Sequence, residues 1–239
     1  MKTNKQFFAK GTLLSFVAAS TLLFACNKSE VLTESPTVTE EEAAEVMIQS
    51  MSGQSGGLIL QTESTASVVA RMSYACGVTE DTTIVRQNAS GASVTYQFEL
   101  DIVKQLNCEM GLPQNFVVSA DAHTTYSGPR MSSDDNSHTE FMVTGFNPQD
   151  DYLNVTIDGT RRGSQQSKVR AQRSFNSELT VKSTDIAIDK STGLIGSGTI
   201  EVHFTGELST GKTVEYDAMI ILKGNKEAIV AFSNNATYE

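Results

Sequence analysis

Hydrophobic and polar residues alternate through the middle and the end of the chain. Between Val94 and Ile102 an apolar side chain occupies every second position, with Thr, Gln, Glu and Asp between. A period of two is typical of a strand with one buried and one solvated face. Strand-like segments begin near Thr82 and recur at 115–123, 139–146, 152–157, 178–181, 185–188, 198–205, 212–222 and 227–232.

Short glycine-bearing turns separate the later segments, and another turn is expected near Asn88–Gly91. Turns of this length join neighbouring antiparallel strands into hairpins. Two polar segments, Met131–Ser137 and Arg161–Lys168, are expected to be loops. We therefore predict a mainly β fold. Its antiparallel meander would form a curved sheet, a half-barrel or a sandwich, with one or two short helices on the N-terminal side.

A helix is predicted just before the strands. Thr39 and Glu42 have the spacing of a capping box, in which each side chain bonds the other's backbone N–H. Ala43, Met47 and Met51 then recur on one face, and a cluster of glycines follows. The pattern predicts a helix that packs one apolar face against the sheet.

The next segment, residues 58–75, fits two interpretations. The apolar triplets 58–60 and 68–70 are consistent with short buried strands. Alternatively, Ser64 caps a second helix that extends to Tyr74. We favour the helix.

The first residues have the features of a secretory signal. Lys2, Lys5 and Lys10 form a basic leader without an acidic residue, and Thr12–Phe24 is an uncharged, mostly apolar run. Its 13 residues are too few to span a hydrocarbon core, which needs about 20. This length suits the apolar segment of a signal peptide.

The residues before Cys26 indicate how this signal would be cleaved. Leu23, at −3, is too large for the A-x-A pattern of ordinary signal peptidase. Leu23-Phe24-Ala25-Cys26 resembles the Leu-x-(Ala/Gly/Ser)-Cys lipobox of bacterial lipoproteins, although Phe24 is larger than usual at its position. The resemblance implies lipid transfer to the Cys26 thiol, cleavage before Cys26, and acylation of the new amine.

The chain accordingly divides into three expected parts. Residues 1–25 are the signal peptide, the polar residues 26–38 are a flexible tether, and 39–239 are a single mainly-β domain. Lipid on Cys26 would tether the domain to a membrane of the bacterial cell envelope, expected to be the outer membrane. The periplasmic and the surface face both remain open.

Charge and cysteine content refine this picture. From Cys26 onward, 15 basic and 28 acidic residues give a net charge of −13. Nucleic acid is therefore excluded as a partner, because phosphates require basic patches. With Cys26 lipidated, Cys76 and Cys108 remain, and they flank the turn near Asn88–Gly91. In an oxidising compartment we expect them to form a disulfide across the open end of that hairpin.

No catalytic or metal-binding motif is present. The histidines His123, His138 and His203 form no H-E-x-x-H pattern, and there is no G-x-S-x-G elbow or phosphate-binding glycine pattern. His203 lies in an alternating segment and is expected to face solvent. We therefore nominate no catalytic residue, no metal ligand and no cofactor.

Two acidic segments resemble calcium loops only loosely. Ser132–Asn136, together with Asp150 and Asp151, offers oxygen ligands without EF-hand spacing, so a solvated loop is the favoured interpretation. Asp189–Gly193 is explained by a hairpin turn. A glycosidase needs two carboxylates at a set separation, and nothing in the sequence nominates a pair.

Three functions are compatible with these features. The first is a non-enzymatic carrier for an apolar small ligand, because a helix followed by a long meander is similar to half-barrel lipoprotein-carrier folds. This resemblance is architectural and implies an apolar cavity above about 300 Å³. The second is a structural or adhesion subunit that binds another envelope protein through an exposed strand edge or apolar patch. The third is an enzyme of unrecognised type.

Overall fold

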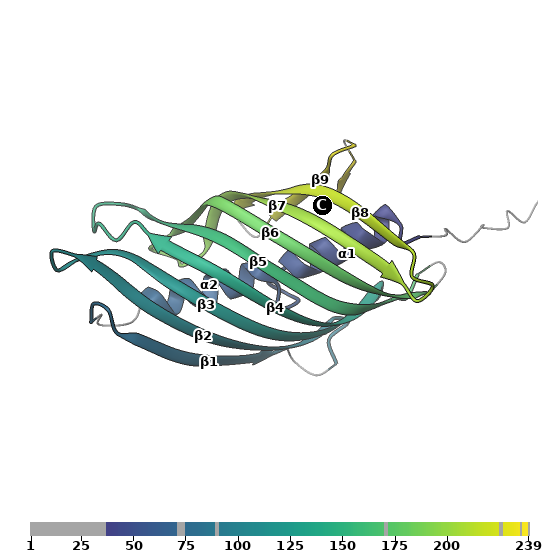
Figure 1. Ribbon diagram of the computed structural model, residues 1–239, viewed down its shortest axis with the longest axis horizontal. Coiled ribbons are helices and arrows are strands. Elements are labelled where there is room, and N and C mark those ends of the chain that lie inside the picture. The colour runs from purple at the N-terminus through teal and green to yellow at the C-terminus, as the bar shows by residue number, and fades with distance from the viewer. Residues whose placement is uncertain are drawn as a thin grey trace, which may run out of the picture. The chain divides into compact units, whose positions relative to one another are not determined.

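The computed structural model describes residues 37–70, 75–88, 91–169, 172–224, 227–234 and 236–238. In this part of the chain two helices precede ten strands (Figure 1). The helices are α1 (Glu40–Met51) and α2 (Leu58–Ala70). The strands are β1 (Thr79–Gln87), β2 (Thr95–Glu109), β3 (Leu112–Ser127), β4 (Met131–Thr144), β5 (Tyr152–Ser167), β6 (Ser174–Asp189), β7 (Ile195–Leu208), β8 (Thr213–Gly224), β9 (Glu227–Phe232) and β10 (Thr237–Tyr238).

The strands form one antiparallel sheet in which each pairs with the next along the chain. This confirms the predicted meander. The sheet curves around the two helices, which lie on its concave side (Figure 1). Among the described residues β1 and β10 are the two ends of the sheet and do not pair with each other. The architecture is therefore an open, curved sheet and not a sandwich.

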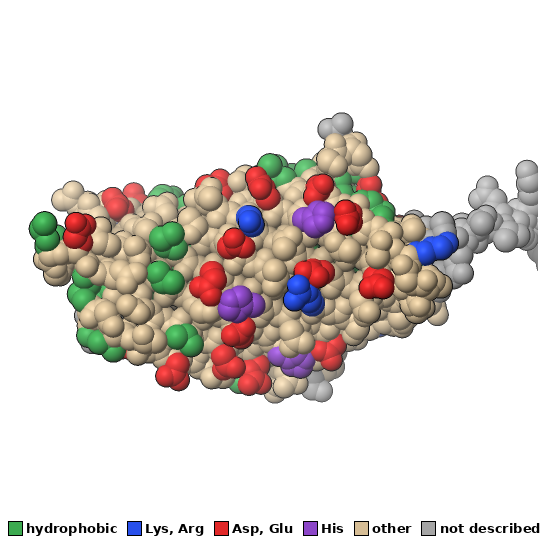
Figure 2. All heavy atoms as spheres, in the orientation of Figure 1, with side chains coloured by type: hydrophobic (Ala, Val, Ile, Leu, Met, Phe, Trp, Pro, Cys, Tyr) green, Lys and Arg blue, Asp and Glu red, His purple; other side chains and the backbone are tan. Residues whose placement is uncertain are grey.

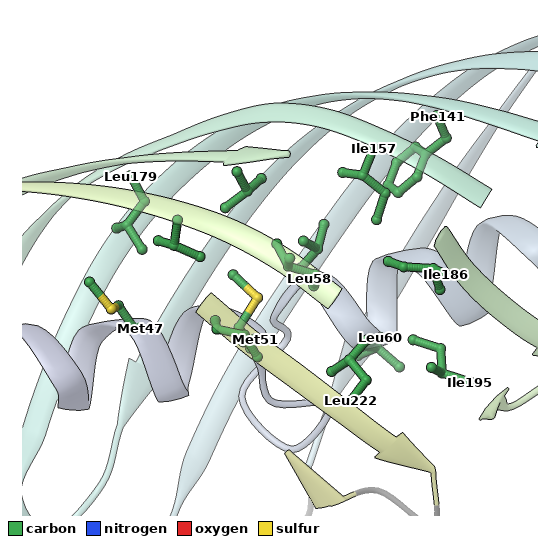
Figure 3. Packing of buried hydrophobic residues seen from close by; sticks show 14 of the residues in the cluster. Met47, Met51, Leu58, Leu60, Phe141, Ile157, Leu179, Ile186, Ile195 and Leu222 are labelled. Carbon is green, nitrogen blue, oxygen red and sulfur yellow. The ribbon is translucent and has the colours of Figure 1, made fainter. Parts of the chain in front are cut away.

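The hydrophobic core lies between the helices and the concave face. Ala43, Met47 and Met51 of α1 are buried, as their spacing predicted. Met47 and Met51, with Leu58 of α2, point among apolar side chains of the sheet (Figure 3). Alternation along each strand supplies the other half of the core, because every second side chain faces inward.

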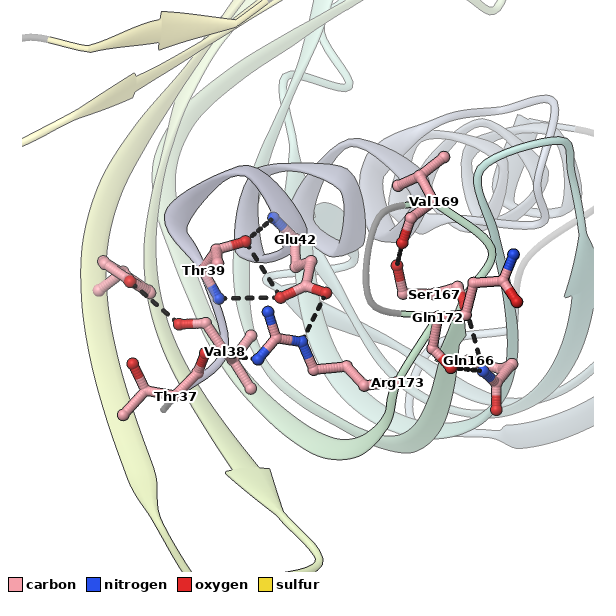
Figure 4. A network of polar contacts seen from close by, with 10 residues as sticks. Thr37, Val38, Thr39, Glu42, Gln166, Ser167, Val169, Gln172 and Arg173 are labelled. Carbon is pink, nitrogen blue, oxygen red and sulfur yellow. Dashed lines mark hydrogen bonds and ion pairs between the residues drawn. The ribbon is translucent and has the colours of Figure 1, made fainter. Parts of the chain in front are cut away.

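A network of polar contacts attaches the start of α1 to the sheet (Figure 4). Glu42 N donates to Thr39 Oγ1 at 3.3 Å, and Thr39 N donates to Glu42 Oε2 at 2.9 Å, so the predicted capping box is present. Glu42 Oε1 also accepts from Arg173 Nε at 3.0 Å, just before β6. Arg173 Nη1 donates to the backbone oxygen of Thr37 at 2.9 Å. One carboxylate therefore caps the helix and holds it to the sheet.

The second helix begins earlier than predicted. It starts at Leu58, whereas we expected Ser64 to cap it. The apolar triplet 58–60 therefore forms the first turn of a helix and not a strand, and Leu58 and Leu60 are buried. Ser64 lies inside the helix and is itself buried. Residues 71–74, the predicted end of this helix, lie outside the described residues.

Both segments expected to be polar loops are strands. Met131–Ser137 belongs to β4, and Arg161–Ser167 belongs to β5. Apart from Met131, their inward-facing positions carry no apolar side chain. The polar side chains of Asp135, Arg161 and Gln165 are buried because they pair with one another: Arg161 Nη2 donates to Asp135 Oδ2 at 2.7 Å, and Gln165 Nε2 donates to Asp135 Oδ1 at 2.8 Å. The period of two is present here in polar residues, which conceals it from a search for apolar alternation.

Cys76 and Cys108 are joined by a disulfide, with their Cα atoms 5.6 Å apart. Thr79 lies opposite Gln105, so the two cysteines close the open end of the β1–β2 hairpin in continuous register. The leader, Leu23-Phe24-Ala25 and Cys26 lie outside the described residues. The expected tether, 26–38, overlaps them only at Thr37 and Val38. Val38 is buried in the core.

Candidate functional site: a groove at the open side of the sheet

A groove of about 700 Å³ is lined by segments that are distant in the sequence. The α1–α2 region contributes one side, and β8 and β9 contribute the other. Arg86, near the end of β1, also lines the groove, so residues from both ends of the open sheet meet around it. Its apolar lining residues are Ile48, Met51, Ile59, Leu60, Ile220, Ala228, Ile229 and Val230.

The loop between the helices sets the position of this lining. At Gly56, where φ is +75°, a β-carbon would lie 2.9 Å from Thr124 Cγ2 and 3.1 Å from Phe98 Cβ. Gly57 passes even closer to the end of α1, since a β-carbon there would lie 2.5 Å from Ser50 O. Two glycines therefore let the chain turn tightly against β2 and β3 and begin α2 at Leu58.

The two helices expose part of their apolar surface in the groove. Met51 and Leu60 are buried in the core, whereas Ile48 and Ile59 are only partly buried. Figure 3 shows Met51 and Leu60 of the helices among the buried side chains of the core. The groove is therefore a continuation of the hydrophobic core toward solvent.

Among the described residues, four charged side chains also line the groove: Glu63, Arg86, Lys223 and Glu227. Glu63 Oε1 is 3.5 Å from the backbone N–H of Ile195. Neither Arg86 nor Lys223 has an ion-pair partner within the described part of the chain. No histidine, cysteine or tyrosine is among the lining residues that the structure describes. The groove thus offers apolar contact and point charges. Ser52, the one hydroxyl-bearing residue among its described lining residues, accepts from the backbone N–H of Gln54 at 3.1 Å.

A second candidate, the polar cluster around the Asp135–Arg161 ion pair, is too enclosed to hold a ligand. The side chains of Asp135 and Arg161 are 3% and 8% exposed. The cavity beside Arg161 has a volume of about 20 Å³, which is room for about one water molecule. The cluster therefore belongs to the interior of the domain.

The three histidines lie on the convex face, and each contacts a carboxylate of the neighbouring strand. His123 Nε2 is 2.8 Å from Asp134, His138 Nδ1 is 2.8 Å from Asp121, and His203 Nδ1 is 2.7 Å from Asp217. The hydrogen bond to Asp121 raises the pKa of His138, and burial opposes this only in part. His203 is a solvent-facing strand residue, as expected.

The convex face is also rich in acidic side chains, with few lysines and arginines among them (Figure 2). No group of three or more His, Cys, Asp or Glu side chains within the described ranges is arranged to hold a metal ion. In the segment considered for calcium, Asp134 contacts His123 and Asp135 turns inward to Arg161. Asp189 closes the β6–β7 turn by accepting from the N–H groups of Ser191 and Thr192.

The groove residues were not identified from the sequence. Ile48 and Ile59 belong to ordinary amphipathic patterns, and Arg86 and Lys223 are ordinary cations that each follow a short apolar run. Only the return of β8 and β9 toward the helices brings them together. No local signal marks such a site.

Comparisons with protein-family models, with curated proteins and with solved structures found no match to this chain. Among the described residues no helix has the length and apolar character needed to cross a membrane.

Proposed function

We propose that this protein is a membrane-anchored lipoprotein whose domain binds an apolar small ligand in the groove beside α1 and α2. The carrying observation is the groove itself. Its volume of about 700 Å³ lies within the range of roughly 300–1,000 Å³ for small-molecule sites. Ile48 and Ile59 leave apolar surface exposed there, which a ligand would cover.

A binding role is favoured over catalysis by the chemistry of the lining. Apolar side chains dominate it, and the charged groups come from separate elements: Glu63 from α2, Arg86 from β1 and Lys223 from β8. An acyl chain or another apolar molecule would gain free energy in proportion to the apolar area removed from water. The polar groups would orient one end of it.

A photoreactive fatty acid tests the groove in membranes that contain the full chain. A diazirine on the acyl chain should label peptides that contain Ile48–Glu63 and Ile220–Val230. Ile59→Asp should reduce this labelling about tenfold, which corresponds to a loss of about 1.4 kcal/mol in the free energy of ligand binding. The substitution suits the fold, because an acidic residue in the first turn of α2 is favoured by the helix dipole.

Met142→Asp is the matched control, since Met142 is an exposed apolar residue on the convex face. It should leave the labelling of the groove peptides unchanged. Peptide mapping separates groove labelling from any labelling near Cys26. Labelling spread over the outer surface, or insensitive to Ile59→Asp, would contradict the binding role.

The anchor is tested separately from the ligand. A bacterial host expressing the full chain should incorporate a clickable palmitate analogue into it and should retain it in the outer-membrane fraction. Cys26→Ser should abolish both properties, because the resemblance of Leu23-Phe24-Ala25-Cys26 to a lipobox assigns the lipid to this thiol. Label that persists in Cys26→Ser would contradict the proposed anchor.

A structural or adhesion subunit is the second candidate, and a specific observation favours it. Within the described residues β1 pairs with β2 on one side and with no strand on the other. An exposed edge of this kind is a ready template for another strand.

A further inference from the structure

The exposed edge of β1 is long and regular. Its nine residues form an edge about 30 Å long at about 3.4 Å per residue. β1 contains no proline, and its pairing with β2 runs without a bulge from Thr79 to Gln87. Val85 is 61% exposed. Natural edge strands commonly carry prolines, bulges, lysines or inward-pointing charges that prevent pairing. β1 has no proline, bulge or lysine, and its inward-facing charges, Glu80 and Arg86, disfavour any pairing that does not bring each of them an opposite charge.

The disulfide holds this edge in place. Cys76 lies three residues before β1, and its bond to Cys108 continues the β1–β2 register. Gly77 N also donates to Leu106 O at 2.8 Å. A strand fixed in this way loses little further conformational freedom when another strand pairs with it.

The sequence of β1 is complementary to itself in one antiparallel register. If Thr83 lies opposite Thr83 of a second copy, all nine residues acquire a partner, and Glu80 lies opposite Arg86 twice. Glu80 and Arg86 lie opposite Lys104 and Phe98 of β2, whose side chains are buried, so both face the concave side. Directly opposite residues in antiparallel strands share a face and come into contact.

Other registers are poorer. Shifting the two-fold axis to Thr82 or Ile84 shortens the paired segment and places Glu80 or Arg86 opposite an uncharged residue or no residue. Shifting it to Asp81 sets Asp81 against itself, a like-charge pair that is destabilising. Only the register centred on Thr83 combines full overlap with two opposite-charge pairs.

The charges that would meet are available. Arg86 has no ion-pair partner among the described residues. Glu80 contacts Lys104 Nζ through Oε2 at 3.3 Å, and its side chain is still 39% exposed. The second carboxylate oxygen of Glu80 can therefore accept from the guanidinium of a second copy.

We propose that this protein forms a two-fold symmetric dimer by antiparallel pairing of β1 with β1 of a second copy, centred on Thr83. The two sheets become one continuous sheet, and Glu80 of each copy pairs with Arg86 of the other. This interaction goes beyond ligand binding in the groove, although the two share Arg86, which also lines the groove.

Cysteine cross-linking of the full chain tests the register. Thr83→Cys places a thiol opposite its own copy, at the Cα separation of about 4.5–5.5 Å found for opposed residues, which a disulfide can bridge. Non-reducing gels of the exported protein should show a cross-linked dimer. Thr180→Cys is the control, because Thr180 also lies on the convex face but has β5 and β7 on its two sides. The parent chain, which lacks the introduced cysteine, shows how much cross-linked dimer arises through Cys26.

Charge reversal tests the pairing. In the Thr83→Cys background, Arg86→Glu turns both attractive pairs into repulsive ones and should reduce the cross-linked fraction at least about tenfold. Lys212→Glu makes the same change of charge at an exposed turn residue and should have no effect. Protease resistance equal to the parent's shows that each variant is folded. Thr83→Cys dimers no more abundant than those of Thr180→Cys, insensitivity to Arg86→Glu, or adducts with a different protein would each overturn the proposal.

Discussion

The carboxylate of Asp135 occupies the space that a side chain on Gly163 would need. The two residues lie directly opposite each other on β4 and β5, and both face the concave side. A β-carbon added to Gly163 would overlap Asp135 Oδ1 and would lie 2.6 Å from Asp134 O. The absence of a side chain at this position therefore makes room for the buried ion pair with Arg161.

Gly163→Ala should consequently destabilise the protein strongly. The methyl group would displace the Asp135 carboxylate from Arg161 and Gln165, leaving buried polar groups without their contacts. Overpacking and a broken buried ion pair each cost roughly 1–5 kcal/mol, so we expect a loss of about 3 kcal/mol in the free energy of unfolding. Urea denaturation measures it.

Gly196→Ala is the control for this substitution. Gly196 also lies in a strand, but a β-carbon there would approach Tyr152 no closer than 3.4 Å, an ordinary contact. The expected change is within about 1 kcal/mol. Equal losses for the two variants would mean that Gly163 has no special role beside Asp135.

The same pair of strands shows where sequence reasoning reached its limit. Apolar alternation located β2, β7 and β8 because their inward side chains form the core. In β4 and β5 the inward positions near Asp135 and Arg161 are polar, and they are buried only because they neutralise each other across 26 residues of sequence. A local pattern cannot show that pairing, so both segments were predicted to be loops.

The groove was unpredictable for a related reason. The capping box of α1 is local and was recognised, as was the pairing of Cys76 with Cys108 around one hairpin. The groove requires β8 and β9 to return toward α1 and α2, more than 140 residues later in the chain. Its existence depends on the curvature of the whole sheet, which no single segment specifies.

The contact between Glu42 and Arg173 should be important for the position of α1. Glu42→Ala removes the capping interaction with Thr39 and the carboxylate that Arg173 contacts, where the two side chains are 7% and 14% exposed. We expect a loss of roughly 2–4 kcal/mol in the free energy of unfolding. Glu41→Ala is the control: Glu41 pairs with Arg130 at the surface, and such pairs contribute at most about 1 kcal/mol. Similar losses in the free energy of unfolding for Glu42→Ala and Glu41→Ala would show that burial of the Glu42–Arg173 pair adds no stability.

The disulfide should stabilise β1 more than the rest of the sheet. Closing a loop with a sequence separation of 32 residues lowers the entropy of the unfolded chain and stabilises by about 3–4 kcal/mol in the chain-entropy model. The double variant Cys76→Ser, Cys108→Ser should lose this amount. Amide hydrogen exchange should accelerate first in Thr79–Gln87, the terminal strand, and remain slow in β6 and β7, which have strands on both sides. A uniform acceleration would contradict a local role.

On the convex face, Asp121 should control the titration of His138. The hydrogen bond of 2.8 Å between His138 Nδ1 and Asp121 Oδ1 favours the imidazolium, burial opposes it in part, and the charges of Asp121 and Glu140 support it, so the pKa of His138 is raised. A raised pKa means that this contact stabilises the fold fully below the unfolded value of about 6.5. This stabilisation disappears as the pH rises through the pKa of His138 in the folded protein.

NMR titration of the imidazole measures the effect directly. The midpoint for His138 should lie above 6.5 in the parent chain, and Asp121→Asn should lower it, because the amide keeps the size of the side chain but carries no charge. The stability difference between the two proteins should then be larger at pH 5 than at pH 8. Asp217→Asn changes the same kind of contact at His203, on strands that do not touch β4, and should leave His138 unchanged. A His138 midpoint unaffected by Asp121→Asn would show that the hydrogen bond across β3 and β4 does not hold the proton.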